Sequence, residues 1–77
     1  MSQQTTDSVH QLSNGHWIVA RWVERAAQYH APMTIAERRL TGCHTWYARN
    51  VDNLGGGYVY TRRPDALRRA RIIYGED

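Results

Sequence analysis

The apolar positions of this 77-residue chain change their spacing along the sequence, and the spacing predicts the secondary structure. Between residues 16 and 30 they recur at i, i+3 and i+4 and cover an arc of about 140° on a helical wheel. This pattern predicts an amphipathic helix over 16–30, which Ser13 or Asn14 caps. The helix ends before Pro32, because a residue that precedes a proline avoids the α region.

The same stretch also carries a hairpin signal. Asn14-Gly15 is a typical two-residue turn. In this alternative, residues 8–12 and 16–23 pair as antiparallel strands on either side of the turn. We favour the helix because a strand would place Arg21 on the same face as Trp17 and so leave no cleanly apolar face.

Capping residues predict two further helices. Thr34 and Glu37 have the spacing of a capping box, and a glycine follows the apolar positions, so a short helix is expected over 35–41. Pro64 suits the first turn of a helix, and a glycine again stands where a C-cap belongs. These signals predict a final helix over 64–74.

Aromatic and β-branched residues mark two strands between these helices. They lie in residues 44–51 and 57–62, on either side of the three consecutive glycines Gly55–Gly57. Strand, glycine loop and strand predict a β-hairpin. We attribute the three glycines to flexibility of the loop.

The elements together predict one α+β domain over 14–77, in the order helix, helix, β-hairpin, helix. Residues 1–13 are rich in Ser, Thr and Gln and predict a flexible tail. In the alternative, the N-terminal hairpin joins the second hairpin in one antiparallel sheet, and the C-terminal helix packs on that sheet.

Positive charge is concentrated near the C-terminus. The chain has ten basic residues besides histidine, all of them arginine, and a formal net charge of +3. Five of the ten lie within ten residues, at Arg62, Arg63, Arg68, Arg69 and Arg71. The planar guanidinium group suits phosphate, carboxylate and aromatic partners. On the helical wheel Ile72 lies among these arginines and away from the core stripe, which is typical of a binding patch.

Three aromatic residues complete this candidate docking surface. Tyr58 and Tyr60 directly precede the arginines, and Trp17 falls on the polar side of the predicted helix over 16–30, where it is a candidate interface anchor. In the competing interpretation the arginines form a solvated helix face and Trp17 packs in the core. The small core also leaves open a homodimer formed through Ile72 or Trp17.

The side chains argue against catalysis, a cofactor or a metal. Cys43 and His44 are neighbours at the start of a predicted strand and project from opposite faces, so they do not form a nucleophile and base pair. The four histidines and the one cysteine show no zinc-ligand spacing. The glycine loop joins two strands, and there is no lysine to complete a phosphate-binding loop. We therefore expect a protein that is not an enzyme.

The composition also indicates a compartment. A single cysteine excludes an intramolecular disulfide and favours the reducing cytoplasm. The longest apolar run, Trp17–Ala20, is much too short to span a membrane. We expect a cytoplasmic protein that has no membrane partner.

The function predicted from these features is a small, basic, non-enzymatic binding module. Its arginine and aromatic patch would dock on a polyanionic partner, either nucleic acid or a nucleic-acid-binding protein complex. The element order resembles a winged helix-turn-helix in topology alone, and the helix over 35–41 has no Asn or Gln to read bases. The alternative is an inhibitor or adaptor of the phage or mobile-element type that acts by protein–protein binding, for example on a host defence complex.

Overall fold

Two small antiparallel sheets form the framework of residues 8–75, which are the residues that the computed structural model describes. The first sheet has the strand order β1-β2-β6, and the second has the order β3-β4-β5. The strands are β1 (Val9–Gln11), β2 (Trp17–Val19), β3 (Arg21–Val23), β4 (Gln28–Pro32), β5 (Thr45–Ala48) and β6 (Val59–Tyr60). The helices are α1 (Ile35–Thr41), the short 3-10 turn η1 (Val51–Asn53) and α2 (Arg63–Tyr74). The predicted α+β class is therefore confirmed.

The N-terminal hairpin forms, and the helix predicted over 16–30 is wrong. β1 pairs with β2 and places Val9 opposite Val19. The turn is closed by the Leu12 N–H, which donates to the His16 carbonyl at 2.7 Å, and by Gly15, whose φ is 92°. The Asn-Gly turn signal therefore outweighs the helical spacing of the apolar residues.

The chain changes from one sheet to the other at Ala20. This residue is fully buried, and its N–H donates to the Ser8 carbonyl at 3.1 Å. β3 then begins at Arg21 and pairs with β4. The strand that the alternative placed over 16–23 is thus split into two strands of different sheets.

β2 supplies side chains to two separate clusters of buried residues. Val19 packs with Val9, Ala66 and Ala70 beneath α2. Its neighbour Ile18 projects from the opposite face and packs with Ala20 and with Ala31 of the second sheet. β2 therefore has no polar face, which is why its sequence lacks the alternation expected of a strand.

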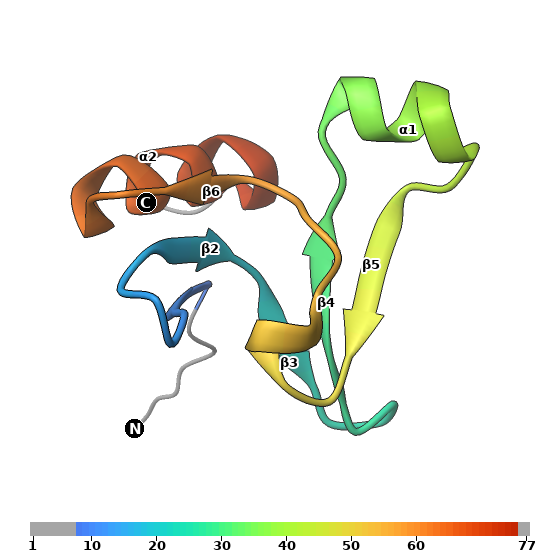
Figure 1. The fold of residues 1–77 in the computed structure, drawn as a ribbon, viewed down its shortest axis with the longest axis horizontal. Helices are drawn as coiled ribbons and strands as arrows, with labels where there is room; N and C mark the ends of the chain where they lie inside the picture. The colour runs from blue at the N-terminus through green and yellow to red at the C-terminus, as the bar shows by residue number, and fades with distance from the viewer. Residues whose placement is uncertain (1–7, 76–77) are drawn as a thin grey trace.

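α2 covers the first sheet, on the left of Figure 1. Its buried residues are the alanines Ala66 and Ala70, whose small side chains allow the helix to lie close to the strands. Pro64 lies in the first turn, and the Gly75 N–H donates to the Arg71 carbonyl at 2.8 Å in a left-handed C-cap. The helix predicted over 64–74 is confirmed.

The second sheet lies on the right of Figure 1, with α1 above it. α1 spans the residues that were predicted, 35–41, and has the full capping box. The Thr34 N–H donates to Glu37 Oε1 at 2.9 Å, and the Glu37 N–H donates to Thr34 Oγ1 at 3.2 Å. α1 buries none of its residues, so the cap is a principal source of its stability. With 16–30 in strands and a turn, the resemblance to a helix-turn-helix is lost.

The β-hairpin predicted from 44–51 and 57–62 is wrong. β5 pairs with β4 and places Trp46 opposite Ala31. β6 pairs with β2 and places Tyr60 opposite Trp17. The connection between β5 and β6 is long enough to cross from one sheet to the other, so the two strands take partners that are distant in sequence.

The three consecutive glycines in this connection pack against Glu37 and Trp46. The Gly57 N–H donates to Glu37 Oε2 at 3.1 Å, and Trp46 Nε1 donates to Glu37 Oε1 at 3.2 Å. A Cβ atom on Gly55 would lie 2.5 Å from Trp46 Cζ3, and one on Gly56 would overlap the Glu37 carboxylate. The glycines are therefore needed for close packing. We call Glu37, Trp46 and Gly55–Gly57 the glycine latch.

Glu37 is ionised in this latch. Its partial burial alone would raise its pKa, but the hydrogen bonds from the backbone of Thr34, the Trp46 indole and the backbone of Gly57 outweigh that effect and hold the pKa below its usual value. The latch joins α1 and β5 to the segment that leads into β6. It therefore helps to position Tyr58 and Tyr60.

The N-terminal segment is described only in part. The tail was predicted over 1–13, and residues 1–7 lie outside the described residues. Val9–Gln11 form the edge strand β1. Within residues 8–75, the helices are too short and too polar to cross a bilayer.

Candidate docking surface

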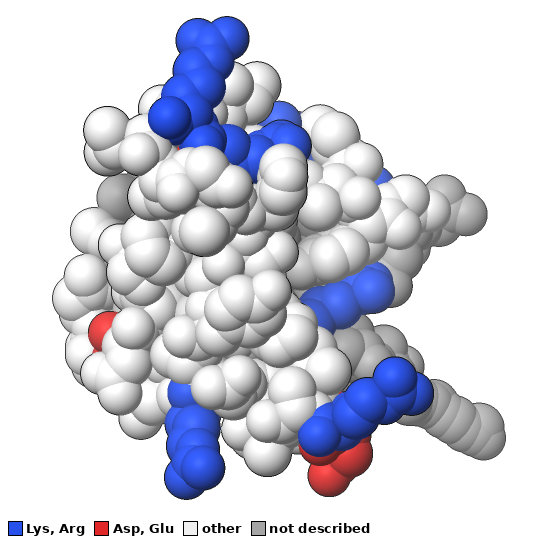
Figure 2. All heavy atoms as spheres, turned by 90° about the vertical axis from the view of Figure 1, so that its right-hand side faces the viewer, with Lys and Arg blue, Asp and Glu red and all other residues white. Residues whose placement is uncertain are grey.

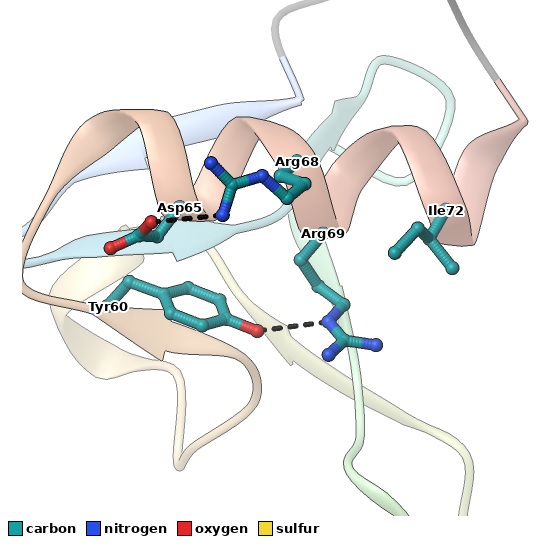
Figure 3. Close-up of a pocket in the computed structure, with 5 residues that line it drawn as sticks. All are labelled: Tyr60, Asp65, Arg68, Arg69 and Ile72. Atoms are coloured by element: carbon teal, nitrogen blue, oxygen red, sulfur yellow. Dashed lines mark hydrogen bonds and ion pairs between the residues drawn. The ribbon is translucent and has the colours of Figure 1, made fainter.

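An open pocket of about 250 Å³ lies between α2 and β6. It is lined by Tyr60, Asp65, Arg68, Arg69 and Ile72. Figure 3 shows that the ring of Tyr60 comes from the sheet and the other four side chains from the helix. Four of these five residues were predicted from the sequence to bind a partner, and Asp65 was not.

Arg69 is held in place by two tyrosines. Its Nε donates to the Tyr60 hydroxyl oxygen at 3.0 Å, and its guanidinium carbon lies 5.2 Å from the centre of the Tyr58 ring. The side chain is half-buried. Its two Nη groups make no hydrogen bond to any residue in the described range 8–75. Arg69 is therefore oriented by the protein while most of its donors stay unused.

Tyr60 also keeps a donor. Its oxygen accepts the bond from Arg69, so its own hydroxyl hydrogen is left to donate. A ligand oxygen placed between the two side chains would receive bonds from both Tyr60 and Arg69. This arrangement suits an oxyanion such as phosphate or carboxylate.

The other arginine of the pocket lies beside a carboxylate. Arg68 Nη1 is 3.4 Å from Asp65 Oδ1, and the two side chains are 73% and 38% exposed. A pair as exposed as this contributes only about 0–1 kcal/mol to stability. Both groups therefore remain accessible to a ligand.

Ile72 forms the apolar wall of the pocket. It is 66% exposed, although Ala70, two positions earlier on the same helix, is buried. Figure 3 shows Ile72 beyond Arg69 along α2. The pocket thus combines one apolar side chain, one aromatic ring and charges of both signs.

The remaining predicted residues lie outside this pocket. Trp17 is on β2, where it is half-buried against the cluster beneath α2, and the Arg63 guanidinium lies 5.7 Å from the centre of its ring. This half-buried position favours the interpretation that Trp17 packs in the core over the interpretation that it is an exposed interface anchor. Arg62 and Arg71 are exposed at the two ends of α2.

The other five arginines lie outside this cluster, and two of them, Arg38 and Arg39, are adjacent on α1. Figure 2 shows the face that carries α1 and β5, where the blue side chains lie at the margins and white atoms lie between them. At the start of β3, Arg21 lies 3.8 Å from the centre of the Tyr74 ring. That contact joins β3 to the end of α2, and sequence reasoning missed it because it depends on the sheet change at Ala20.

Sequence reasoning also missed the part that Asp65 plays in the pocket. From the sequence, Asp65 was expected to complement the positive end of the helix dipole and to form a weak surface pair with Arg69, whereas in the structure it pairs with Arg68. Asp65 and Arg68 are three residues apart, and this spacing could have predicted that they lie on the same side of the helix. The pairing of Arg69 with Tyr60 had no such local signal.

No metal site is found in the described part of the chain. Residues 8–75 contain no group of three or more His, Cys, Asp or Glu side chains that could hold an ion. Comparisons with protein-family models, with curated proteins and with solved structures found no match to this chain. The chemistry of the pocket is therefore argued from its own residues.

Proposed function

We propose that this protein is a non-enzymatic binding module that docks on a polyanionic partner, nucleic acid or a nucleoprotein complex, through the surface formed by α2 and β6. The observation that carries the proposal is the held position of Arg69, with both Nη groups unused beside the free donor of Tyr60. A donor that is already oriented loses little side-chain entropy on binding. We also propose a cytoplasmic location, because the single cysteine favours a reducing compartment.

The charge around the pocket supports the same partner. Arg62, Arg63 and Arg71 are exposed on or beside α2, and Asp65 is the one acidic residue between positions 58 and 74. Such a local excess of positive charge attracts phosphates over a distance and brings them to the pocket.

Binding of a labelled oligonucleotide by the purified protein, measured by fluorescence anisotropy over a series of salt concentrations, tests the proposal. Affinity should fall steeply as salt rises, and Arg68→Ala with Arg69→Ala should weaken binding and reduce the salt slope by about one for each phosphate that is no longer neutralised. The matched control is Arg38→Ala with Arg39→Ala, a second adjacent and exposed pair on α1. Equal affinity of the two double variants would contradict the proposal.

The first double variant removes the Arg69–Tyr60 bond, so its fold must be checked by thermal unfolding. A second variant, Arg62→Ala with Arg71→Ala, removes two exposed charges whose side chains make no hydrogen bond or ion pair within residues 8–75. It should also reduce the salt slope, and it leaves the tyrosine contacts in place.

A second proposal is the inhibitor or adaptor of the phage or mobile-element type. It is supported by large apolar side chains exposed away from the pocket: Leu40, which is 88% exposed, Ile35 on the same helix and Tyr47 on β5. Aromatic side chains such as that of Tyr47 are enriched at protein interfaces. This proposal takes precedence if the purified protein binds no nucleic acid at low salt. Its own test is loss of a target protein from pull-downs when Leu40→Asp is introduced.

A further inference from the structure

The pocket between α2 and β6 is concave and small. Its volume of about 250 Å³ lies just below the range of roughly 300–1,000 Å³ that is usual for pockets holding drug-sized ligands. A group of about the size of one nucleotide would occupy it. A duplex keeps the faces of its bases stacked inside, so it offers the pocket phosphates but no base.

Two donors of the pocket converge where Tyr60 meets Arg69. The Tyr60 hydroxyl and the Nη groups of Arg69 lie together there, and both are available to an oxyanion. A phosphate at this point would be bound by a neutral and a charged donor at once.

The lining of the pocket also carries a carboxylate. Asp65 and its ion-pair partner Arg68 together present an acceptor and donors, and a sugar-phosphate backbone, which has no amino group to donate, does not match this part of the lining. A carboxylate instead accepts hydrogen bonds from amino groups, such as the exocyclic amine of cytosine. The ring of Tyr60 lines the same pocket and provides an aromatic surface for a base.

We infer that this pocket binds one unpaired nucleotide of a single-stranded nucleic acid, with its phosphate at Arg69 and Tyr60 and its base beside Asp65 and Arg68. The inference rests on the proposed function and specifies its partner: a single strand, with preference for a base that carries an exocyclic amine. Asp65 is the residue that sets this preference, and Arg68 donates to the neighbouring acceptor of the same base.

The experiment compares three probes at neutral pH and one salt concentration: oligo-dC, oligo-dT and a duplex of the same length. We expect both single strands to bind more tightly than the duplex, and oligo-dC to bind several-fold more tightly than oligo-dT. Tyr60→Ala should cost about tenfold in affinity for either single strand, because base stacking on an aromatic ring is lost.

Asp65→Asn separates base recognition from simple charge. Removal of a negative charge raises the affinity for every nucleic acid, so the decisive quantity is the ratio of the two single-strand affinities, which should fall towards one. Glu24→Gln removes the same charge from an exposed residue of another part of the surface and should leave the ratio unchanged.

Equal binding of the duplex and the single strands, equal binding of oligo-dC and oligo-dT, or a ratio that Asp65→Asn leaves intact would each overturn the inference while the proposed function stands. Absence of binding to all three probes at low salt would overturn both. A preference for oligo-dC that the wild type and Glu24→Gln show, and that Asp65→Asn loses, supports both the inference and the proposed function.

Discussion

Replacement of Glu37 by glutamine tests the glycine latch directly. The glutamine carbonyl can take the place of Oε1 and accept from the Thr34 N–H and the Trp46 indole. Its amide group would then take the place of Oε2 and bring a second donor against the Gly57 N–H, so that bond is lost. In the two remaining bonds, from the Thr34 N–H and the Trp46 indole, the acceptor is then a neutral amide oxygen and no longer a charged carboxylate.

The size of the effect follows from these three bonds. A hydrogen bond to a charged group contributes about 1.5–3 kcal/mol and a neutral one about 0.5–1.5 kcal/mol. With one bond lost, two weakened and a reduction for the partial exposure of the side chain, Glu37→Gln should lower the free energy of unfolding by about 2 kcal/mol. For a domain of this size, that loss corresponds to a Tm lower by roughly 10 °C.

The assay is urea unfolding followed by tryptophan fluorescence and circular dichroism. Glu24→Gln is the matched control, because Trp22 Nε1 donates to Glu24 Oε1 at the same distance of 3.2 Å but at an exposed site. The control should change the free energy of unfolding by less than about 0.5 kcal/mol. Equal effects of the two substitutions would refute the latch as a source of stability.

The pH dependence of the same difference gives an independent test. The pKa of Glu37 is lower in the folded protein than its ordinary unfolded value of about 4.3. The ionised carboxylate therefore stabilises the fold above that value, and this contribution is lost as the pH falls through the lowered pKa. Since glutamine does not titrate, the difference between the wild type and Glu37→Gln should be constant from neutral pH to about 5 and shrink below it.

Three further substitutions test the packing. Gly55→Ala should destabilise the fold by about 1–3 kcal/mol in urea unfolding, because its Cβ atom would lie 2.5 Å from Trp46 Cζ3. Ala70→Leu should cost a similar amount, about 1–3 kcal/mol in thermal unfolding, because it overpacks the contact between α2 and β2. Leu40→Ser should change the free energy of unfolding by less than about 0.5 kcal/mol, because Leu40 is 88% exposed, and a larger loss would show that α1 packs more tightly than this exposure indicates.

The two helices could be predicted from the sequence because their signals are local. The capping box of Thr34 and Glu37 and the position of Pro64 act within one turn of the chain. Glycines in the left-handed conformation end both helices. None of these signals depends on which other elements lie nearby.

The strands could not be predicted in the same way, because their pattern depends on distant parts of the chain. β2 is buried on both faces, at Ile18 and Val19, so it lacks the polar face that would distinguish a strand from a helix. The partners of β5 and β6 are β4 and β2, and no residue near the glycine latch indicates that choice.

The candidate docking surface shows the same division. The arginine cluster and the exposed position of Ile72 could be inferred from the wheel of one helix. The bond between Arg69 and Tyr60 could not, because it requires β6 to lie in the first sheet beside β2. The sequence of the helix thus indicates where the arginines lie, and contacts between distant elements determine which arginine is held in place.

The position of β2 between two cores has a consequence for how the protein unfolds. Unfolding of either sheet would expose one face of the strand to water and remove the packing that orders it on that side. Each sheet has three short strands, and each buried cluster includes a residue of β2. We therefore expect the described domain to unfold as one cooperative unit, so that amide hydrogens on both sides of Ala20 exchange through the same global opening and Trp17 and Trp46 report a single transition.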